Sequence, residues 1–192
     1  MVLEKQRYSF FFNYAQNLTV RGIMKINDNI QNRWWKKLLT EVNQREKING
    51  MSDWDIYIWG IWDIMWYIKG ETNKTIAVHF WGDCLRVFYN FGDLDTGKVN
   101  ELLKDTKFDV IKSCIDRIDG SNHETICWEN RNFSFGTPYD TCFPDARTLS
   151  WYAGNETEKF ADQLIAKVRK FQSPEITALF KEINEKCRND NQ

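Results

Sequence analysis

The sequence predicts one α+β domain spanning residues 1–192, in which an antiparallel β-meander packs against helices and the chain ends in a helical hairpin. Three observations lead to this prediction. An amphipathic helical repeat comes first, runs of alternating apolar and polar residues separated by turn signals follow, and two more helical repeats close the chain. A length of 192 residues suits a single domain with a sizeable core.

The composition is that of a folded, water-soluble protein. Hydrophobic residues make up 42% of the chain and charged residues 28%, which supplies both a core and a solvated surface. The net charge is only −1, whereas a protein that coats DNA is normally strongly basic. Residues 1–50 hold nine Lys and Arg against four Asp and Glu, so any contact with nucleic acid is expected from this basic N-terminal quarter.

The N-terminus and the cysteines indicate an intracellular, cytoplasmic protein. The start, MVLEKQRYSFFFNYAQ, has an early acidic residue and no small-residue cleavage site, so it does not resemble a secretory signal. The cysteines are odd in number and form no C-x-x-C pair. We therefore expect reduced core thiols, with no disulfide, metal or cofactor. The five thiols are Cys84, Cys114, Cys127, Cys142 and Cys187.

The first predicted helix covers residues 27–48. An apolar residue recurs at every fourth position from Ile30 to Val42, which is the spacing of one helix face. The pair Asn49-Gly50 is typical of a helix end.

The next stretch, WDIYIWGIWDIMWYIKG at residues 54–70, is predicted to form a strand. Asp55 and Asp63 exclude a membrane span, which needs about 20 apolar residues. The run fits both the helical and the strand period, and its Trp, Ile and Tyr content favours the strand. Gly60 suits a bulge or bend in a run that is long for one strand. Strand alternation places the apolar side chains at every second position on the core face, and these are Trp54, Ile56, Ile58, Trp62, Ile64, Trp66 and Ile68.

The middle of the chain predicts the rest of the sheet and a helical pair. TIAVHFW at 75–81 and CLRVFYNF at 84–91 continue the meander, since turn residues separate them. Helical patterns follow near 97–105 and near 111–118, and Gly120 closes the second. ETICWE at 124–129 is expected to add a further strand.

The last part of the chain predicts a long loop and the helical hairpin. Residues 130–153 have two prolines and many aromatics, and loops of this length in a compact domain are often functional. Asn155 with Glu158 has the spacing of a capping box for the first helix of the hairpin. Ser173-Pro174 has the residues of a cap and first turn for the second.

The two histidines carry the one catalytic hypothesis. His123 and Thr125 form an H-x-T triplet, which resembles the motif of the two-histidine phosphoesterases. The resemblance implies a second such motif, with one imidazole as base and the other as acid. The only partner, His79-Phe80-Trp81, lacks the hydroxyl residue. The alternative function is therefore a metal-independent phosphodiesterase or ribonuclease that uses His79 and His123, with Thr125 on phosphate.

Arg117 extends this hypothesis. Five residues separate Arg117 from His123, a spacing that resembles that of the HEPN-type ribonucleases. That family carries the pair on a helix, whereas Gly120 interrupts any helix here. No P-loop, G-x-G-x-x-G, G-x-S-x-G or H-E-x-x-H motif supports another enzyme class.

The aromatic content supports a different function. The chain has nine Trp, 13 Phe and seven Tyr, and Trp and Tyr are the residues of binding hot spots and base-stacking platforms. Trp34-Trp35 is followed by two lysines, and the 130–153 region brings aromatics and an arginine together. The predicted ligand-binding residues are Trp34, Trp35, Tyr139, Trp151, Tyr152 and Arg147.

The leading functional prediction is thus a non-enzymatic binding protein. It is expected to hold a protein partner or a small nucleotide through an aromatic-rich surface or pocket, away from membranes. The Asn, Lys and Ile content is typical of an AT-rich bacterial or phage genome, where small proteins without motifs are often immunity or counter-defence factors.

Overall fold

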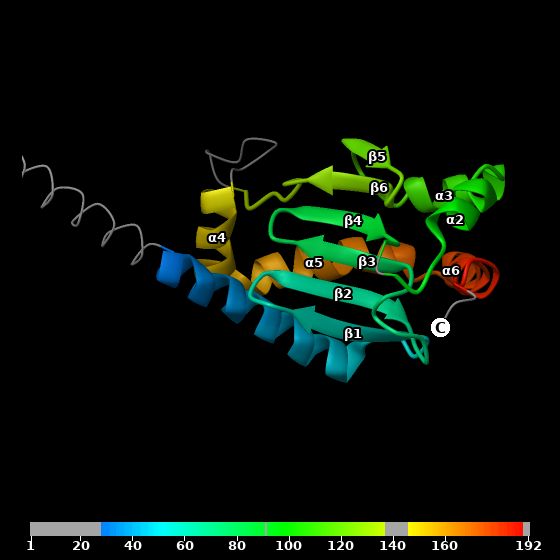
Figure 1. The fold of residues 1–192 in the computed structure, drawn as a ribbon. Coiled ribbons are helices and arrows are strands. Elements are labelled where there is room, and N and C mark those ends of the chain that lie inside the picture. The colour runs from blue at the N-terminus through cyan, green and yellow to red at the C-terminus, as the bar shows by residue number, and fades with distance from the viewer. Residues whose placement is uncertain (1–27, 91, 137–145, 190–192) are drawn as a thin grey trace, which may run out of the picture.

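The computed structural model describes residues 28–90, 92–136 and 146–189. Six strands form one antiparallel sheet in the order β1-β2-β3-β4-β6-β5 (Figure 1). The first four strands are neighbours in sequence and in space, so the predicted meander is confirmed, and β6 and β5 extend it. The strands are β1 (Trp54–Trp59), β2 (Asp63–Ile68), β3 (Ala77–Trp81), β4 (Cys84–Phe88), β5 (Gly120–Asn122) and β6 (Thr125–Asn130).

The helices lie behind one face of the sheet and along its borders. The described chain begins in a helix over residues 28–49, which confirms the first predicted helix. The other helices are α2 (Thr96–Leu102), the 3-10 turn η1 (Thr106–Phe108), α3 (Asp109–Lys112), α4 (Ala146–Asn155), α5 (Thr157–Phe171) and α6 (Pro174–Lys186). In Figure 1 α5 runs behind the sheet, while helix 28–49 lies along its β1 border. Among the described residues, no helix combines the length and the apolar character needed to cross a membrane.

The stretch at 54–70 forms a hairpin, where the sequence predicted one long strand with a bend. β1 and β2 pair antiparallel, and Gly60 adopts φ 71° in the turn between them. Such a positive φ is strained for any residue with a Cβ, which explains why a glycine stands there. Trp62 lies in this turn and is exposed, so the prediction that it faces the core is wrong.

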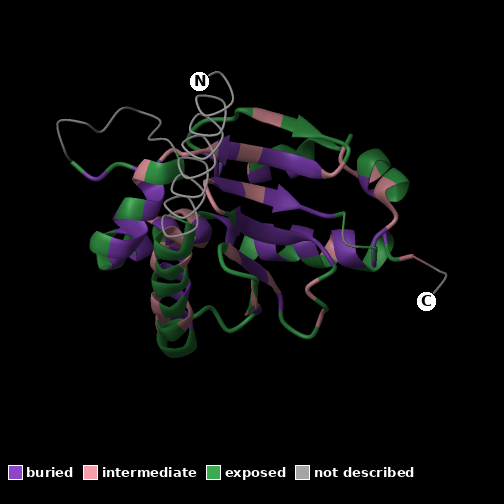
Figure 2. Cartoon of the chain, turned by 60° about the vertical axis from the view of Figure 1, so that its left-hand side comes forward, coloured by how far each residue is buried: buried purple, intermediate pink, exposed green. Residues whose placement is uncertain are grey.

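The core lies between one sheet face and the helices. Ile64, Trp66 and Ile68 of β2 face the same way as their partners in β1, as the alternation predicted. At the centre, the Phe80 ring of β3 lies 6.1 Å from the Trp35 ring and 6.0 Å from the Phe160 ring of α5. Burying each such side chain contributes about 2 to 3 kcal/mol. Figure 2 shows buried residues in the central strands and on the helix sides that face them.

Two regions depart from their predicted secondary structure. Of the helix expected near 111–118, only the end of the single turn α3 forms, and Ile118 is exposed. The loop expected at 130–153 contains helix α4 from Ala146 onward. Asn155 belongs to this helix and donates to the Trp151 carbonyl, so it does not cap α5 as predicted. The cap residue of α5 is Glu156, which makes no side-chain cap bond.

The C-terminal helical hairpin is confirmed. Two residues link α5 to α6, and the Ser173 hydroxyl accepts a bond from the Ile176 amide at 3.2 Å, as the Ser-Pro cap predicted. The Trp54 indole of β1 donates to the Thr177 hydroxyl of α6 at 3.1 Å, which joins the hairpin to the sheet. The four cysteines within the described residues are buried and unpaired.

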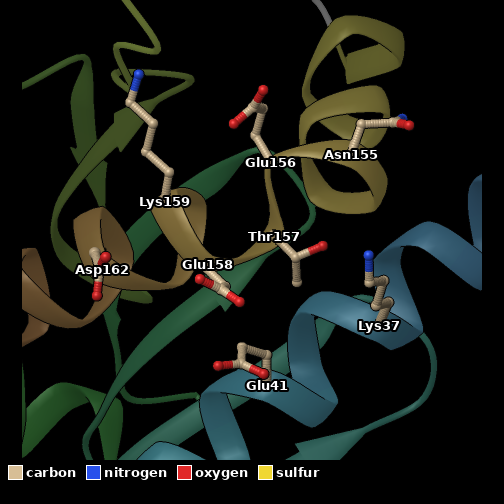
Figure 3. Close-up of a pocket in the computed structure, with 8 residues that line it drawn as sticks. All are labelled: Lys37, Glu41, Asn155, Glu156, Thr157, Glu158, Lys159 and Asp162. Atoms are coloured by element: carbon tan, nitrogen blue, oxygen red, sulfur yellow. The ribbon is translucent and has the colours of Figure 1, made fainter.

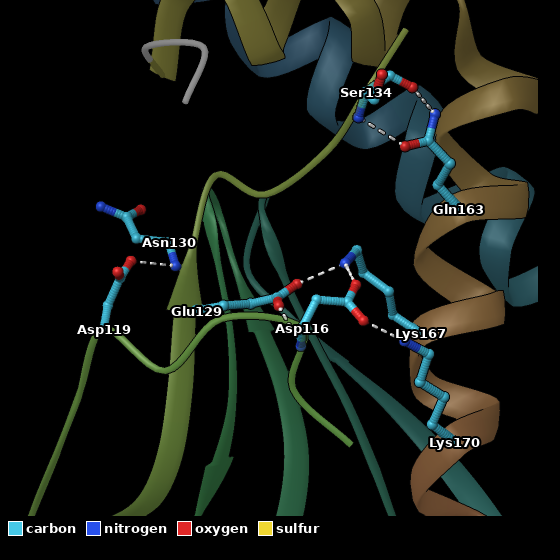
Figure 4. A network of polar contacts seen from close by, with 8 residues as sticks. All are labelled: Asp116, Asp119, Glu129, Asn130, Ser134, Gln163, Lys167 and Lys170. Carbon is cyan, nitrogen blue, oxygen red and sulfur yellow. Dashed lines mark hydrogen bonds and ion pairs between the residues drawn. The ribbon is translucent and has the colours of Figure 1, made fainter. Parts of the chain in front are cut away.

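An ionic cluster joins β6 to α5 (Figure 4). Glu129 faces the core from β6 and is only 1% exposed. The Lys167 ammonium of α5 lies 2.7 Å from a Glu129 oxygen and 2.6 Å from an Asp116 oxygen. The Asp116 amide donates to Glu129, and Lys170 also pairs with Asp116. The cluster thus fixes β6, whose other side faces away from the helices.

We predict that Lys167→Ala lowers the free energy of unfolding by about 3 kcal/mol, because it leaves the Glu129 carboxylate buried and without its cation. Urea denaturation measures the change. Lys104→Ala, which removes an exposed pair with Glu101, is the control and is expected to cost less than about 1 kcal/mol. An equal loss of unfolding free energy in the two variants would show that the cluster stabilises the fold no more than an exposed ion pair does.

Candidate functional site

One face of the sheet is not covered by any helix of the described residues. In Figure 1 this face is turned toward the viewer, with α5 behind the sheet. Every second residue of a strand belongs to it, because successive side chains of a strand lie on opposite faces. We call this surface the open face. Strand pairing defines its main residues as Tyr57, Trp59, Asp63, Met65, Tyr67, His79, Trp81, Arg86, Phe88 and Trp128.

Strand register brings aromatic and charged side chains of the open face into rows. Trp59 is paired with Asp63, and Asp63 with Trp81, so two indoles flank one carboxylate. In the next row, His79 is paired with Arg86 on β4, and Arg86 with Trp128 on β6. Side chains paired across antiparallel strands lie about 5 Å apart, which makes each row a continuous strip.

His79 is a buried histidine at the centre of the open face. Its Nδ1 accepts a hydrogen bond from Arg86 Nε at 3.2 Å. The proton of the neutral imidazole therefore resides on Nε2, which lies 3.5 Å from Asp63 Oδ1. Burial lowers the pKa of His79 below its ordinary value, and the Arg86 charge lowers it further, while Asp63 offsets part of this. His79 is thus neutral near pH 7.

Arg86 lies half-buried between aromatic rings. Its guanidinium carbon is 4.1 Å from the centre of the Phe88 ring and 4.9 Å from that of Trp81, which are cation-π distances. Burial lowers the pKa of Arg86, against the smaller opposing influence of Cys84, Asp63 and Glu124. An arginine nevertheless stays charged in proteins, so the open face holds a fixed positive charge.

A pocket of about 260 Å³ opens beside Arg86. Two indoles contribute its apolar wall, and amide, hydroxyl and carboxylate groups contribute the rest. Burial raises the pKa of the Cys84 thiol in this pocket to about 12, so the thiol is protonated and is no nucleophile at neutral pH. The lining residues are Trp81, Asp83, Cys84, Arg86, Asn122, Thr125, Trp128 and Asn130.

Exposed aromatics gather at one end of the open face, next to this pocket. Trp59 is 55% exposed, Trp81 is 49% exposed, and Trp62 of the β1–β2 turn is 41% exposed. The Gly82 amide of the β3–β4 turn donates to the Trp62 carbonyl at 3.0 Å, so the two turns lie side by side. Ile61 of the first turn is also exposed. Large apolar side chains that share one exposed region mark interaction sites.

The residues of the catalytic hypothesis lie in different surroundings. His123 is in the turn between β5 and β6, where it is exposed and its Nε2 lies 3.3 Å from Glu124. Thr125 is buried and lines the pocket beside Arg86. Arg117 is exposed and pairs with Asp119 at 3.1 Å. His79 shares the open face with the pocket, and joint action of His79 and His123 stays a prediction from the sequence.

The predicted ligand-binding aromatics lie mainly around α4. Trp35 and Tyr152 are buried in the core, and the Tyr152 ring stacks on Phe135 at 3.7 Å. Trp34 packs so closely on Gly154 that a Cβ there would lie 1.9 Å from the indole. Trp151 and Arg147 are exposed on α4. Tyr139 lies outside the described residues.

A second cavity, of about 440 Å³, lies between helix 28–49 and the junction of α4 with α5 (Figure 3). Its wall carries Lys37 and Lys159 with four carboxylates, and it has no aromatic residue. Lys37 donates to the Gly154 carbonyl at 2.9 Å, and Lys159 to that of Phe135. The first bond joins helix 28–49 to α4, and the second joins α5 to the segment after β6, so both lysines of the wall already have partners within the fold. Within the described part of the chain, no three His, Cys, Asp or Glu side chains form a metal cluster.

Fold and site together define an α+β protein whose antiparallel sheet presents, on the face that no helix of residues 28–90, 92–136 and 146–189 covers, aromatic side chains around a charged pocket. No protein-family model matches the chain, and no curated protein or solved structure matches it significantly. Sequence analysis does not single out Trp81, Arg86 or Trp128. The signal that could have identified them is strand alternation, because each directly follows a buried core residue in its strand and so faces the other side of the sheet.

We predict that folding stability falls as the pH drops below the ordinary His pKa of 6.5, because burial lowers the pKa of His79 in the folded state. The unfolded chain then binds a proton that the folded chain does not. The loss of stability ends once the pH falls below the pKa of His79 in the folded state. Chemical denaturation at pH 7.5 and pH 5.5 measures the difference.

His79→Gln is expected to reduce this pH dependence, whereas His123→Gln, which replaces an exposed side chain, is the matched control. An unchanged pH dependence in His79→Gln would contradict the assignment of the effect to His79.

Proposed function

We propose that this chain is a non-enzymatic binding protein that holds a protein partner on its open face. The observation that carries the proposal is the group of exposed tryptophans at one end of that face, Trp59, Trp62 and Trp81. Trp, Tyr and Arg dominate the binding energy of protein interfaces, and the open face combines all three types. A half-buried arginine beside these rings supplies the polar contact that such interfaces contain.

Charge favours a protein partner over a nucleotide or nucleic acid. Binding of phosphates depends on clustered Lys and Arg side chains. Around the pocket, carboxylates outnumber such cations, since Asp63, Asp83, Asp119 and Glu124 lie on or near it. These carboxylates would repel the several negative charges of a polyphosphate. The rim of a protein interface, in contrast, contains polar and charged residues of both signs.

The face is also built to stay in shape without a ligand. Met65, His79 and Phe88 of this face are buried, although no helix of the described residues covers them. Glu129 and Lys167 hold β6 to α5 from the opposite side. Binding on a preformed surface loses less conformational entropy than binding on one that must first become ordered.

We predict that peptides selected on this protein use the open face. A library of random 12-residue peptides displayed on phage is selected on the full chain, and the recovered peptides are measured by titration. Trp81→Ser is expected to weaken them at least tenfold, because it removes a central indole of the face.

Trp151→Ser is the matched control, since Trp151 is 46% exposed but belongs to α4. Peptides that respond equally to both variants, or only to Trp151→Ser, would contradict the proposed face.

A further inference from the structure

Arg86 differs from the other partly buried arginines because it has no carboxylate partner within the described residues. Arg45 pairs with Glu41, Arg131 pairs with Asp83 at 3.2 Å, and Arg169 pairs with Glu46 at 3.0 Å. Arg86 instead donates Nε to neutral His79 and stacks on aromatic rings. Its charge is therefore partly removed from water without a direct ion pair to compensate for it.

We propose that Arg86 receives the carboxylate of an Asp or Glu side chain from the protein partner, in the pocket between Trp81 and Trp128. This inference rests on the proposed function, and it specifies the chemistry of the contact. The partner's side chain supplies the anion that Arg86 lacks, and its methylene groups contact the two indoles.

The Arg86 guanidinium is oriented before any ligand arrives. Phe88 and Trp81 hold its plane, and the bond to His79 Nδ1 uses its Nε. The two terminal nitrogens remain for the pocket that Arg86 lines. A planar fork of this kind matches a carboxylate with two parallel hydrogen bonds, which gives both strength and direction.

The acidic residues near the pocket make no direct ion pair with Arg86, because their carboxylates contact other side chains, Glu124 among them through Asn90. Asp83 pairs with Arg131 at 3.2 Å, and Asp119 pairs with Arg117 at 3.1 Å. Asp63 lies 3.5 Å from His79. These contacts hold the carboxylates in place, and the terminal nitrogens of Arg86 stay available for one carboxylate of the partner.

The size of the pocket fits a side chain. A volume of about 260 Å³ is below the usual range for drug-sized ligands and leaves room for a carboxylate with one or two methylenes. Thr125 and Asn130 also line it and offer further donors. The exposed indoles of Trp59 and Trp62 lie beyond this pocket and remain for apolar residues of the same partner.

The test uses the peptides selected on the full chain that lose affinity for Trp81→Ser. Each Asp and Glu of a peptide is replaced by Asn or Gln, one at a time. One replacement is expected to weaken binding at least tenfold, because a charge-assisted pair becomes a neutral one. With Arg86→Gln, the acidic peptide and its amide form are expected to bind alike.

Arg117→Gln is the matched control, since its exposed cation already pairs with Asp119, and the preference for the acidic peptide should persist. If Arg86→Gln does not fold, Arg86→Lys and the acid-to-amide comparison on the unchanged chain decide the matter. Peptides that need Trp81 but tolerate every amide replacement would overturn the role of Arg86 and leave the proposed function standing. If no selected peptide depends on Trp81, the proposed function itself fails.

Discussion

The contact of Phe80 with Trp35 and Phe160 is the interaction on which the rest of the structure depends. It joins the third strand, helix 28–49 and α5, which are far apart in sequence, through rings about 6 Å from one another. Because these helices gather behind one side of the sheet, no helix in the described part of the chain covers the other side. The same packing that buries Phe80 thus turns its neighbours His79 and Trp81 toward the open face.

Local sequence was enough to predict most of the fold. The strand pattern, the Ser-Pro cap of α6 and the amphipathic helices depend on neighbouring residues, and the structure confirms them. The errors occur where tertiary contacts override local preference. The 54–70 run was too uniformly apolar to reveal its turn at Gly60. Helix α4 formed where a loop was predicted because Tyr152 stacks on Phe135 and Gly154 packs against Trp34.

The site was predicted less well because it depends on register. The sequence identified His79 and Thr125, which both belong to the open face or its pocket, on the basis of a motif. It could not show that Arg86 pairs with both His79 and Trp128, since that pairing joins three strands with separate turns. Trp34 and Trp35 were predicted to bind a ligand because two lysines follow them. Their burial depends instead on packing against residues that are distant in sequence.

The alternation along β2, β3 and β4 assigns folding and recognition to different residues of the same strands. Val78 and Phe80 face the core, while His79 and Trp81 face outward. Replacement of an outward residue therefore leaves the packing behind the sheet largely unchanged. During evolution such a sheet can change what it recognises through every second codon, while the codons between them preserve the scaffold.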